Sequence, residues 1–180
     1  MRFAYDLGIH RSVYHFLASD GEHEAEIEAG SNIINLKMKD VSGYKESDGI
    51  FILDTGSPHY IKFVEDVMDL DVVKEGTEVR YSEPFSKEGI NVNFVEEKEV
   101  DEIIVRTYER GVEDETYSCG TGVTACAIVC HHNDVGYNDV TVITKGGKLT
   151  VEFDRVGEDM FENIWLCGPA VKVFEGEFQD

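Results

Sequence analysis

One segment of the sequence, residues 117–127, combines a cysteine, two glycines and the start of an apolar run. Cys119 stands directly before Gly120 and Gly122, and the apolar run continues to Cys130. This pattern predicts a loop that enters a helix, with Cys119 at the helix N-terminus, where unpaired backbone N–H groups favour negative charge. A thiol in such a place ionises readily, and the same N–H groups can hold a carboxylate. The segment therefore offers a base and an anion site side by side.

The stretch just upstream, residues 103–111, alternates apolar and polar residues, which predicts a half-buried strand. This strand delivers Glu109 and Arg110 to its end, a few residues before the cysteine. Because most free cysteines are inert packing residues, Cys119 alone would be weak evidence for a site. The charged pair facing an anion-binding helix start is what favours a site here.

Five segments, taken in order, resemble the diaminopimelate epimerase family. They are Thr55-Gly-Ser-Pro-His59, Ile90-Asn-Val-Asn-Phe94, Tyr108-Glu-Arg-Gly111 followed by Ser118-Cys-Gly-Thr-Gly122, Gly146-Gly-Lys-Leu-Thr-Val-Glu152, and Cys167-Gly-Pro-Ala-Val-Lys-Val-Phe-Glu-Gly176. The resemblance runs from about Ala4 to the last residues of the sequence. One such segment would be weak evidence, whereas five in order are specific.

The resemblance implies an α+β fold in which a strand-rich lobe wraps around a buried central helix, with one lobe complete and the other partial. It divides the chain into residues 1–48 as part of a first lobe, residues 49–167 as a complete second lobe, and residues 168–180 as a C-terminal strand that returns toward the first lobe. The residues agree with this fold, because the helix after Cys119 is apolar on every side and such a helix is buried.

The reaction that the resemblance implies is the interconversion of LL- and meso-diaminopimelate in lysine and cell-wall precursor biosynthesis. It needs no cofactor, because a thiolate removes the α-proton while a thiol on the opposite face delivers another. Cys119 would be one of these two thiols. The backbone N–H groups of Gly120 and Thr121 would hold the α-carboxylate and so stabilise the carbanion-like state.

The resemblance also assigns residues to the rest of the substrate, a small diamino dicarboxylic acid. Asn91 and Arg110 would bind its distal amino-acid end, and Glu109 would pair with an ammonium group. Ser57 stands where many family members carry a substrate-binding asparagine, and serine can still donate or accept a hydrogen bond. His59 would support the loop rather than transfer protons.

The family's first cysteine motif, Cys-Gly-Asn-Gly, does not occur in the sequence, and residues 1–9 resemble the helix that normally follows it. The sequence is therefore expected to carry one of two catalytic thiols, as a truncated form, and to be inactive alone. A catalytically silent fragment that keeps the fold is the alternative from a different class.

Two further alternatives depend on particular residues. A proline-racemase-like enzyme would carry an aspartate three residues before the cysteine, where Thr116 stands here. A cluster of side chains near the helix end could bind a metal, but its two cysteines also fit the apolar face of the predicted helix. That cluster comprises Cys126, Cys130, His131 and His132. No metal is expected.

The composition limits the partners and the compartment. The 180 residues carry a formal net charge of −21, which argues against nucleic acid because its phosphates would be repelled. No apolar run reaches the roughly 18 residues of a membrane span, so no membrane is expected. Nothing suggests secretion, so the four cysteines predict reduced thiols in a cytoplasm. The resemblance also allows a homodimer.

Periodicity and turn residues predict a mostly β chain around the central helix. We expect helices over residues 1–9, 61–68 and about 120–132, and strands over residues 24–27, 32–38, 50–54, 91–95, 103–108, 140–144, 149–153, 165–166 and 170–174.

Overall fold

The computed structural model describes residues 1–18, 21–27, 30–133 and 135–177. Within them, thirteen strands form one sheet, in the order β1-β2-β3-β13-β12-β11-β9-β8-β7-β6-β5, with β10 beside β9 and β4 beside β13. The strands are β1 (Val13–Ala18), β2 (Gly21–Ile27), β3 (Ile33–Lys37), β4 (Val41–Ser42), β5 (Lys45–Ser47), β6 (Ile50–Asp54), β7 (Pro58–Phe63), β8 (Asn91–Glu99), β9 (Glu102–Glu109), β10 (Asp114–Thr116), β11 (Gly136–Thr144), β12 (Gly147–Gly157) and β13 (Met160–Pro169). The helices are α1 (Arg2–Asp6), the 3-10 turn η1 (Val67–Asp69), α2 (Val72–Arg80) and α3 (Gly120–Val129).

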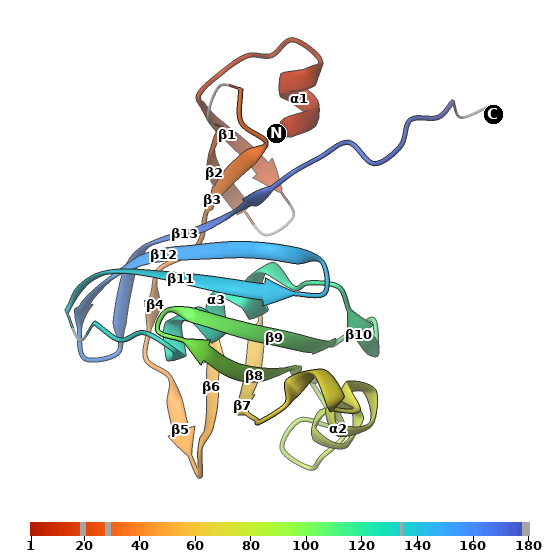
Figure 1. The fold of residues 1–180 in the computed structure, drawn as a ribbon, viewed down its shortest axis with the longest axis vertical. Helices are drawn as coiled ribbons and strands as arrows, with labels where there is room; N and C mark the ends of the chain where they lie inside the picture. The colour runs from red at the N-terminus through yellow and green to blue at the C-terminus, as the bar shows by residue number, and fades with distance from the viewer. Residues whose placement is uncertain (19–20, 28–29, 134, 178–180) are drawn as a thin grey trace.

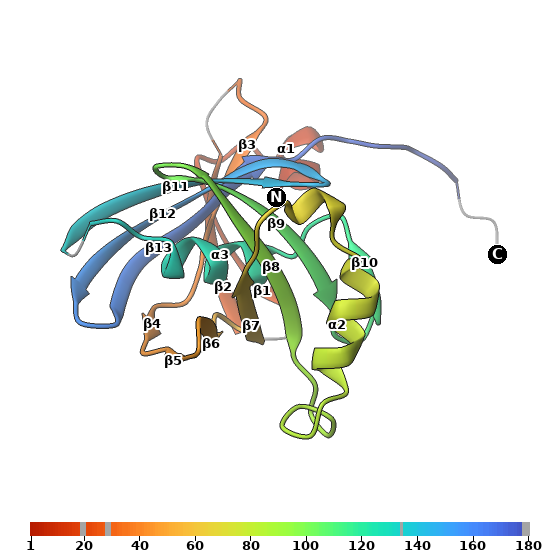
Figure 2. The ribbon, with the colours of Figure 1, turned by 60° about the horizontal axis from the view of Figure 1, so that its bottom comes forward.

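The helix α3 lies inside the curve of the sheet, as the prediction of a buried central helix requires (Figure 2). It contacts β6, β7, β8, β9, β11, β12 and β13. Every residue from Gly122 to Ile128 is buried. The one polar side chain among them, Thr124, donates its hydroxyl hydrogen bond to the carbonyl of Gly120 at 3.0 Å. Small residues such as Ala125 and Ala127 let the strands approach the helix closely. The α+β architecture of strands wrapped on a central helix is therefore confirmed.

A second helix, α2, packs on the outside of β8 and β9 (Figure 2). It begins at Asp71, whose side chain accepts a hydrogen bond from the backbone N–H of Lys74 at 3.1 Å. Gly76 faces the ring of Tyr108, and a β-carbon built there would lie 2.4 Å from the Tyr108 Cβ. The glycine is therefore what allows the helix to lie against β9.

The prediction of a helix over residues 61–68 is wrong. Residues up to Phe63 belong to β7, which runs parallel to β8, and η1 follows. In β7 the three consecutive residues His59, Tyr60 and Ile61 are all buried. Both faces of the strand are covered, so the alternation that marks a strand is missing.

The N-terminal elements lie on one side of β12 and β13, away from α2 and β5 (Figure 1). The strands expected over residues 24–27 and 32–38 are confirmed as β2 and β3, which pair antiparallel. Gly30 between them has a φ of +82°, which glycine adopts without strain. The first strand, β1, was not expected. The helix expected over residues 1–9 is shorter and ends at Asp6.

The strand expected over residues 170–174 is wrong, because β13 ends at Pro169. Val173 and Phe174 are 87% and 86% exposed, and the last backbone bond to a neighbour is from Ala170 N to Asn32 O. No strand among the described residues pairs with residues 171–174. Their alternating apolar side chains therefore do not make a β-strand. Residues 178–180 of the expected C-terminal strand lie outside the described part of the chain. The division at residues 48 and 167 stays a prediction.

Across the described residues, no helix is long and apolar enough to cross a membrane.

Candidate active site

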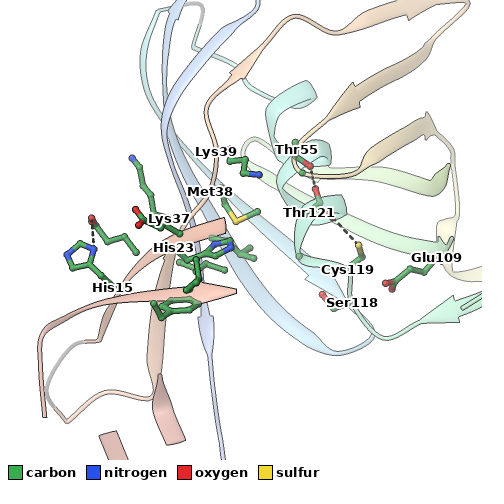
Figure 3. A pocket seen from close by; sticks show the side chains of 18 residues that line it. His15, His23, Lys37, Met38, Lys39, Thr55, Glu109, Ser118, Cys119 and Thr121 are labelled. Carbon is green, nitrogen blue, oxygen red and sulfur yellow. Dashed lines mark hydrogen bonds and ion pairs between the residues drawn. The ribbon is translucent and has the colours of Figure 1, made fainter. Parts of the chain in front are cut away.

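An open cleft of about 970 Å³ lies between the β1–β2 hairpin and the start of α3 (Figure 3). Cys119, Gly120, Thr121 and Glu109 line it, so the structure brings these four predicted residues together. Its other lining residues are His15, Phe16, Leu17, Glu22, His23, Glu24, Leu36, Lys37, Met38, Lys39, Thr55, Gly56, Ser118 and Leu166. The cleft is therefore open to a small polar ligand that meets a thiol, a carboxylate and a helix start on one wall.

Cys119 occupies the N-cap of α3, as the sequence predicted. Its backbone is extended, with φ −120° and ψ 112°, and its carbonyl accepts the N–H of Val123 at 2.8 Å. The loop before it is held in place because Gly146 N donates to Tyr117 O at 2.8 Å. The first N–H groups of a helix have no partner within the helix, so they are suited to hold an anion next to the thiol.

A triangle of polar side chains lies directly behind the cysteine. Ser57 Oγ is 3.0 Å from both His59 Nε2 and Thr121 Oγ1, and these last two atoms are 2.9 Å apart. Thr121 Oγ1 is in turn 3.5 Å from Cys119 Sγ. Thr55 Oγ1 donates to the carbonyl of Thr121 at 2.8 Å, which ties the loop before β7 to the helix start.

His59 is completely buried and titrates far from its ordinary range. Burial, and to a lesser extent the positive charge of Arg110, lower the pKa of His59 to about 3. The imidazole is therefore neutral near pH 7, with one nitrogen that donates and one that accepts.

Two buried residues that the sequence did not suggest complete this polar group. Asn93 Nδ2 lies 3.1 Å from His59 Nδ1 and donates to Tyr60 O at 3.1 Å, while Thr107 Oγ1 donates to Asn93 Oδ1 at 3.0 Å. Asn93 and Thr107 are 0% and 3% exposed. A polar residue on an otherwise apolar strand was the available signal, since buried polar groups are kept where they have partners.

Asn91 and Arg110 are not among the residues that line the cleft. The amide of Asn91 is used within the protein: Nδ2 donates to Ser57 Oγ and Pro58 O, and Oδ1 accepts the backbone N–H of Arg110 at 2.9 Å. Arg110 Nη1 donates to Glu88 O at 3.0 Å. Ser57 and His59 are likewise absent from the lining. The substrate contacts predicted for Asn91, Arg110 and Ser57 stay predictions.

Glu109 reaches the cleft from the end of β9, and the turn after it is held by Glu113. The Glu113 carboxylate accepts the N–H of Gly111 and the hydroxyls of Tyr81 and Tyr108, each at 3.1 Å. The Gly111 N–H is the main reason that the pKa of Glu113 lies below its ordinary value. The turn is thereby fixed, and Glu109 is presented from the rigid end of a strand.

Gly122 allows the helix start to approach the polar side chains behind it. A β-carbon at this position would lie 2.5 Å from Asn93 Oδ1 and 3.2 Å from His59 Cε1. Because both neighbours are buried and hydrogen bonded, they have little room to move. The second glycine of the motif is therefore needed for close packing.

We expect iodoacetamide to label Cys119 first among the four thiols. Cys119 lines the cleft, whereas burial raises the pKa of Cys126 and Cys130 well above the ordinary range and that of Cys167 to about 12. Peptide mass spectrometry after brief labelling at pH 7.5 checks this, with unfolded protein in urea as the control in which all four should react. Labelling of Cys126 first, or of all four equally in the folded protein, would contradict the assignment.

The comparisons with known proteins agree on one family. The family model of diaminopimelate epimerase matches residues 51–173. Proteins named diaminopimelate epimerase are similar to this chain along its length: that of Flavobacterium psychrophilum is 43% identical over 96% of the chain, and that of Aquifex aeolicus is 40% identical over 100% of it.

The chain belongs to the diaminopimelate epimerase family. It spans about two thirds of the length of these relatives, 67% in both cases. The family suggested by the five sequence segments is therefore confirmed, and most of those segments fall within the matched residues.

Solved structures with low sequence identity support the fold alone. A phenazine biosynthesis protein of the PhzF family from Bacillus anthracis is similar to 99% of this chain, with a TM-score of 0.73 and 15% identity, and the chain covers 73% of it. A hydroxyproline epimerase from Agrobacterium vitis is similar with a TM-score of 0.62 at 14% identity. The similarity covers 93% of this chain and 60% of the epimerase chain. This chain thus shares its fold with these proteins.

The rival metal site near the end of α3 finds no support in the geometry. No group of three or more His, Cys, Asp or Glu side chains within the described residues is arranged to hold a metal ion. Cys126 is completely buried in the core, and His131 packs edge-on against Phe161 while its Nδ1 lies 2.7 Å from Ile128 O. These residues belong to the packing around this family's central helix.

Proposed function

We propose that this chain supplies one thiol of a cofactor-independent epimerase that interconverts LL- and meso-diaminopimelate. The observation that carries the proposal is the position of Cys119, at the N-cap of α3 and on the wall of an open cleft. Membership of the family supports the substrate class, and a thiol beside a helix start that suits an anion supports its role as a base.

The reaction would begin with the Cys119 thiolate removing the α-proton of the bound amino acid. The proton passes from carbon to sulfur, and the electron pair left on the α-carbon is spread onto the carboxylate. Backbone N–H groups of Gly120 and Thr121 would stabilise that charge without reorganising. A second acid on the opposite face then gives a proton to the carbon, which inverts the centre.

Glu109 is the group on the cleft wall suited to a substrate ammonium, because a carboxylate there forms a charge-assisted hydrogen bond. Asn91 and Arg110 would bind the distal end of the substrate, as the family resemblance suggests, and Ser57 would contact the substrate where many family members carry an asparagine. The four unpaired thiols fit a reducing cytoplasm, and a homodimer is the assembly that we expect.

The second acid is the open part of the proposal. Among the described residues that line the cleft, Cys119 is the one cysteine. We infer that the opposite acid comes from the third of the family's length that this chain does not cover, and that the 180-residue chain alone epimerises no measurable diaminopimelate.

Incubation of LL-diaminopimelate in deuterium oxide tests this, with the stereoisomers separated by chiral chromatography and α-deuterium followed by mass spectrometry. The chain alone should give no meso isomer. Adding the uncovered N-terminal part of the Flavobacterium psychrophilum relative as a separate polypeptide should give turnover. Cys119→Ala should remove that turnover, whereas Cys130→Ala, outside the cleft, should keep it.

Two results would contradict the proposal in different ways. Turnover by the chain alone that Cys119→Ala abolishes would mean that a second acid lies within these 180 residues or across a dimer. No turnover from a mixture that forms a stable complex would favour the catalytically silent fragment.

A further inference from the structure

The polar side chains behind Cys119 form a chain of hydrogen bonds whose direction the structure fixes. It starts at Thr107 on β9, passes through Asn93 on β8 and His59 on β7, and ends at Thr121 beside the sulfur. Asn93 Nδ2 donates to the carbonyl of Tyr60, which can only accept. The amide orientation of Asn93 is thereby set, with Nδ2 facing His59.

The orientation of Asn93 determines the tautomer of His59. Because Asn93 Nδ2 is a donor, His59 Nδ1 at 3.1 Å must accept, and the single proton of the neutral ring sits on Nε2. The lowered pKa of the buried ring agrees with this neutral form. His59 Nε2 is therefore a donor toward the hydroxyls of Ser57 and Thr121, at 3.0 and 2.9 Å.

The two hydroxyl protons then have defined acceptors. Ser57 Oγ receives a bond from Asn91 Nδ2, so neither Asn91 nor the protonated His59 Nε2 can accept the Ser57 proton. Among the contacts of the described residues, the one left for it is Thr121 Oγ1, at 3.0 Å. The Thr121 hydroxyl proton is then directed to its remaining partner among the described contacts, Cys119 Sγ at 3.5 Å.

We propose that the Thr121 hydroxyl is a positioning group that donates to Cys119 Sγ, held in that direction by Ser57 and neutral His59. This role belongs to the side chain of Thr121 and is separate from that of its backbone N–H. It rests on the proposed function, which takes Cys119 as the reacting group.

The bond suits both states of the sulfur. A thiolate accepts the Thr121 proton strongly, since hydrogen bonds to a charged acceptor are about twice as strong as neutral ones. After the sulfur has taken a proton from carbon, a remaining sulfur lone pair still accepts the same bond more weakly. No proton leaves Thr121 in either direction, so the hydroxyl shifts the balance toward thiolate without joining the transfer.

Other charged groups also face the cleft and affect any titration of the thiol. On the same wall is Glu109, and on the hairpin and β3 side are His15, Glu22, His23, Glu24, Lys37 and Lys39. Arg110 acts on the site through His59. All of these remain in place when Thr121 alone is changed, so a matched variant isolates the hydroxyl.

The test is the pH dependence of Cys119 alkylation by iodoacetamide in the full 180-residue chain, followed on the Cys119 peptide by mass spectrometry. Thr121→Val removes the hydroxyl and keeps the shape, and should move the midpoint of the profile upward by about one pH unit, a tenfold change. Thr121→Ser restores a hydroxyl and should return the midpoint to within about 0.3 units of the wild type.

Thr124→Val is the matched control, because Thr124 lies in the same helix and donates to Gly120 O instead of the sulfur. Its midpoint should not move. An unchanged midpoint in Thr121→Val, or an equal shift in Thr121→Ser, would overturn the proposal. The assay uses no diaminopimelate, so it tests this hydrogen bond separately from the turnover assay. If the midpoint shifts but no epimerase activity is found, the proposed function fails and this inference stands.

Discussion

Replacing Ile128 with aspartate is expected to leave no folded protein. Ile128 is completely buried in α3, in the core formed with the surrounding strands. The substitution removes a large apolar side chain, which typically destabilises a protein by about 2–5 kcal/mol, and places an unpaired carboxylate where no water reaches it. Together these effects reach into the range of the total stability of a domain, about 5–15 kcal/mol.

Far-ultraviolet circular dichroism and a urea titration check this expectation. Val100→Asp is the matched control, because Val100 is 79% exposed at the turn between β8 and β9 and the change there should cost less than about 0.5 kcal/mol. A cooperatively unfolding Ile128→Asp protein would show that α3 is not enclosed by the sheet.

The second large effect is a loss of stability in acid that comes from His59. In the unfolded chain this histidine takes up a proton near pH 6.5, whereas in the fold the pKa is lowered to about 3. The unfolded state therefore binds more protons between these values, and the free energy of unfolding falls by up to about 1.4 kcal/mol for each pH unit below 6.5. Between pH 6.5 and 4.5 this group alone should remove about 2 kcal/mol. Its contribution is fully present from about one pH unit above 6.5.

Urea titrations at several pH values measure this loss. His59→Gln should abolish about 2 kcal/mol of the change between pH 6.5 and 4.5, whatever its stability at neutral pH. His15→Gln should behave as the wild type, because the His15 side chain is 74% exposed. The same pH dependence in wild type and His59→Gln would mean that the ring is protonated in the folded protein.

The sequence predicted the centre of the fold because the pattern there is unambiguous. In residues 120–129 every helical face is apolar, and the structure encloses that helix in strands. The strand β7 was mistaken for a helix because its neighbours cover both faces, which hides the two-residue period. The helix α2 was missed because it buries little more than Val72 and Gly76. Its clearest signal was the capping residue Asp71.

The site was predicted in part for a similar reason. Cys119 and the glycines carry a local signal, because a helix start is built from consecutive residues. Asn93 and Thr107 contribute through contacts between strands, and no local pattern reports which buried polar residues meet. The strand expected over residues 170–174 failed in the same way: alternation is a property of one segment, whereas a strand needs a neighbour.

The pairing of β3 with β13 decides when the chain can complete its sheet. Leu36 lies opposite Leu166, about 130 residues later in the sequence, and β4 also pairs with β13. During synthesis the edge of β3 therefore stays unpaired until residues 160–169 have emerged from the ribosome. Contacts so far apart in sequence form slowly, and an unpaired edge is exposed to other chains meanwhile. The wall of the cleft that carries His15 and His23 is thus among the last parts of the molecule to be set in place.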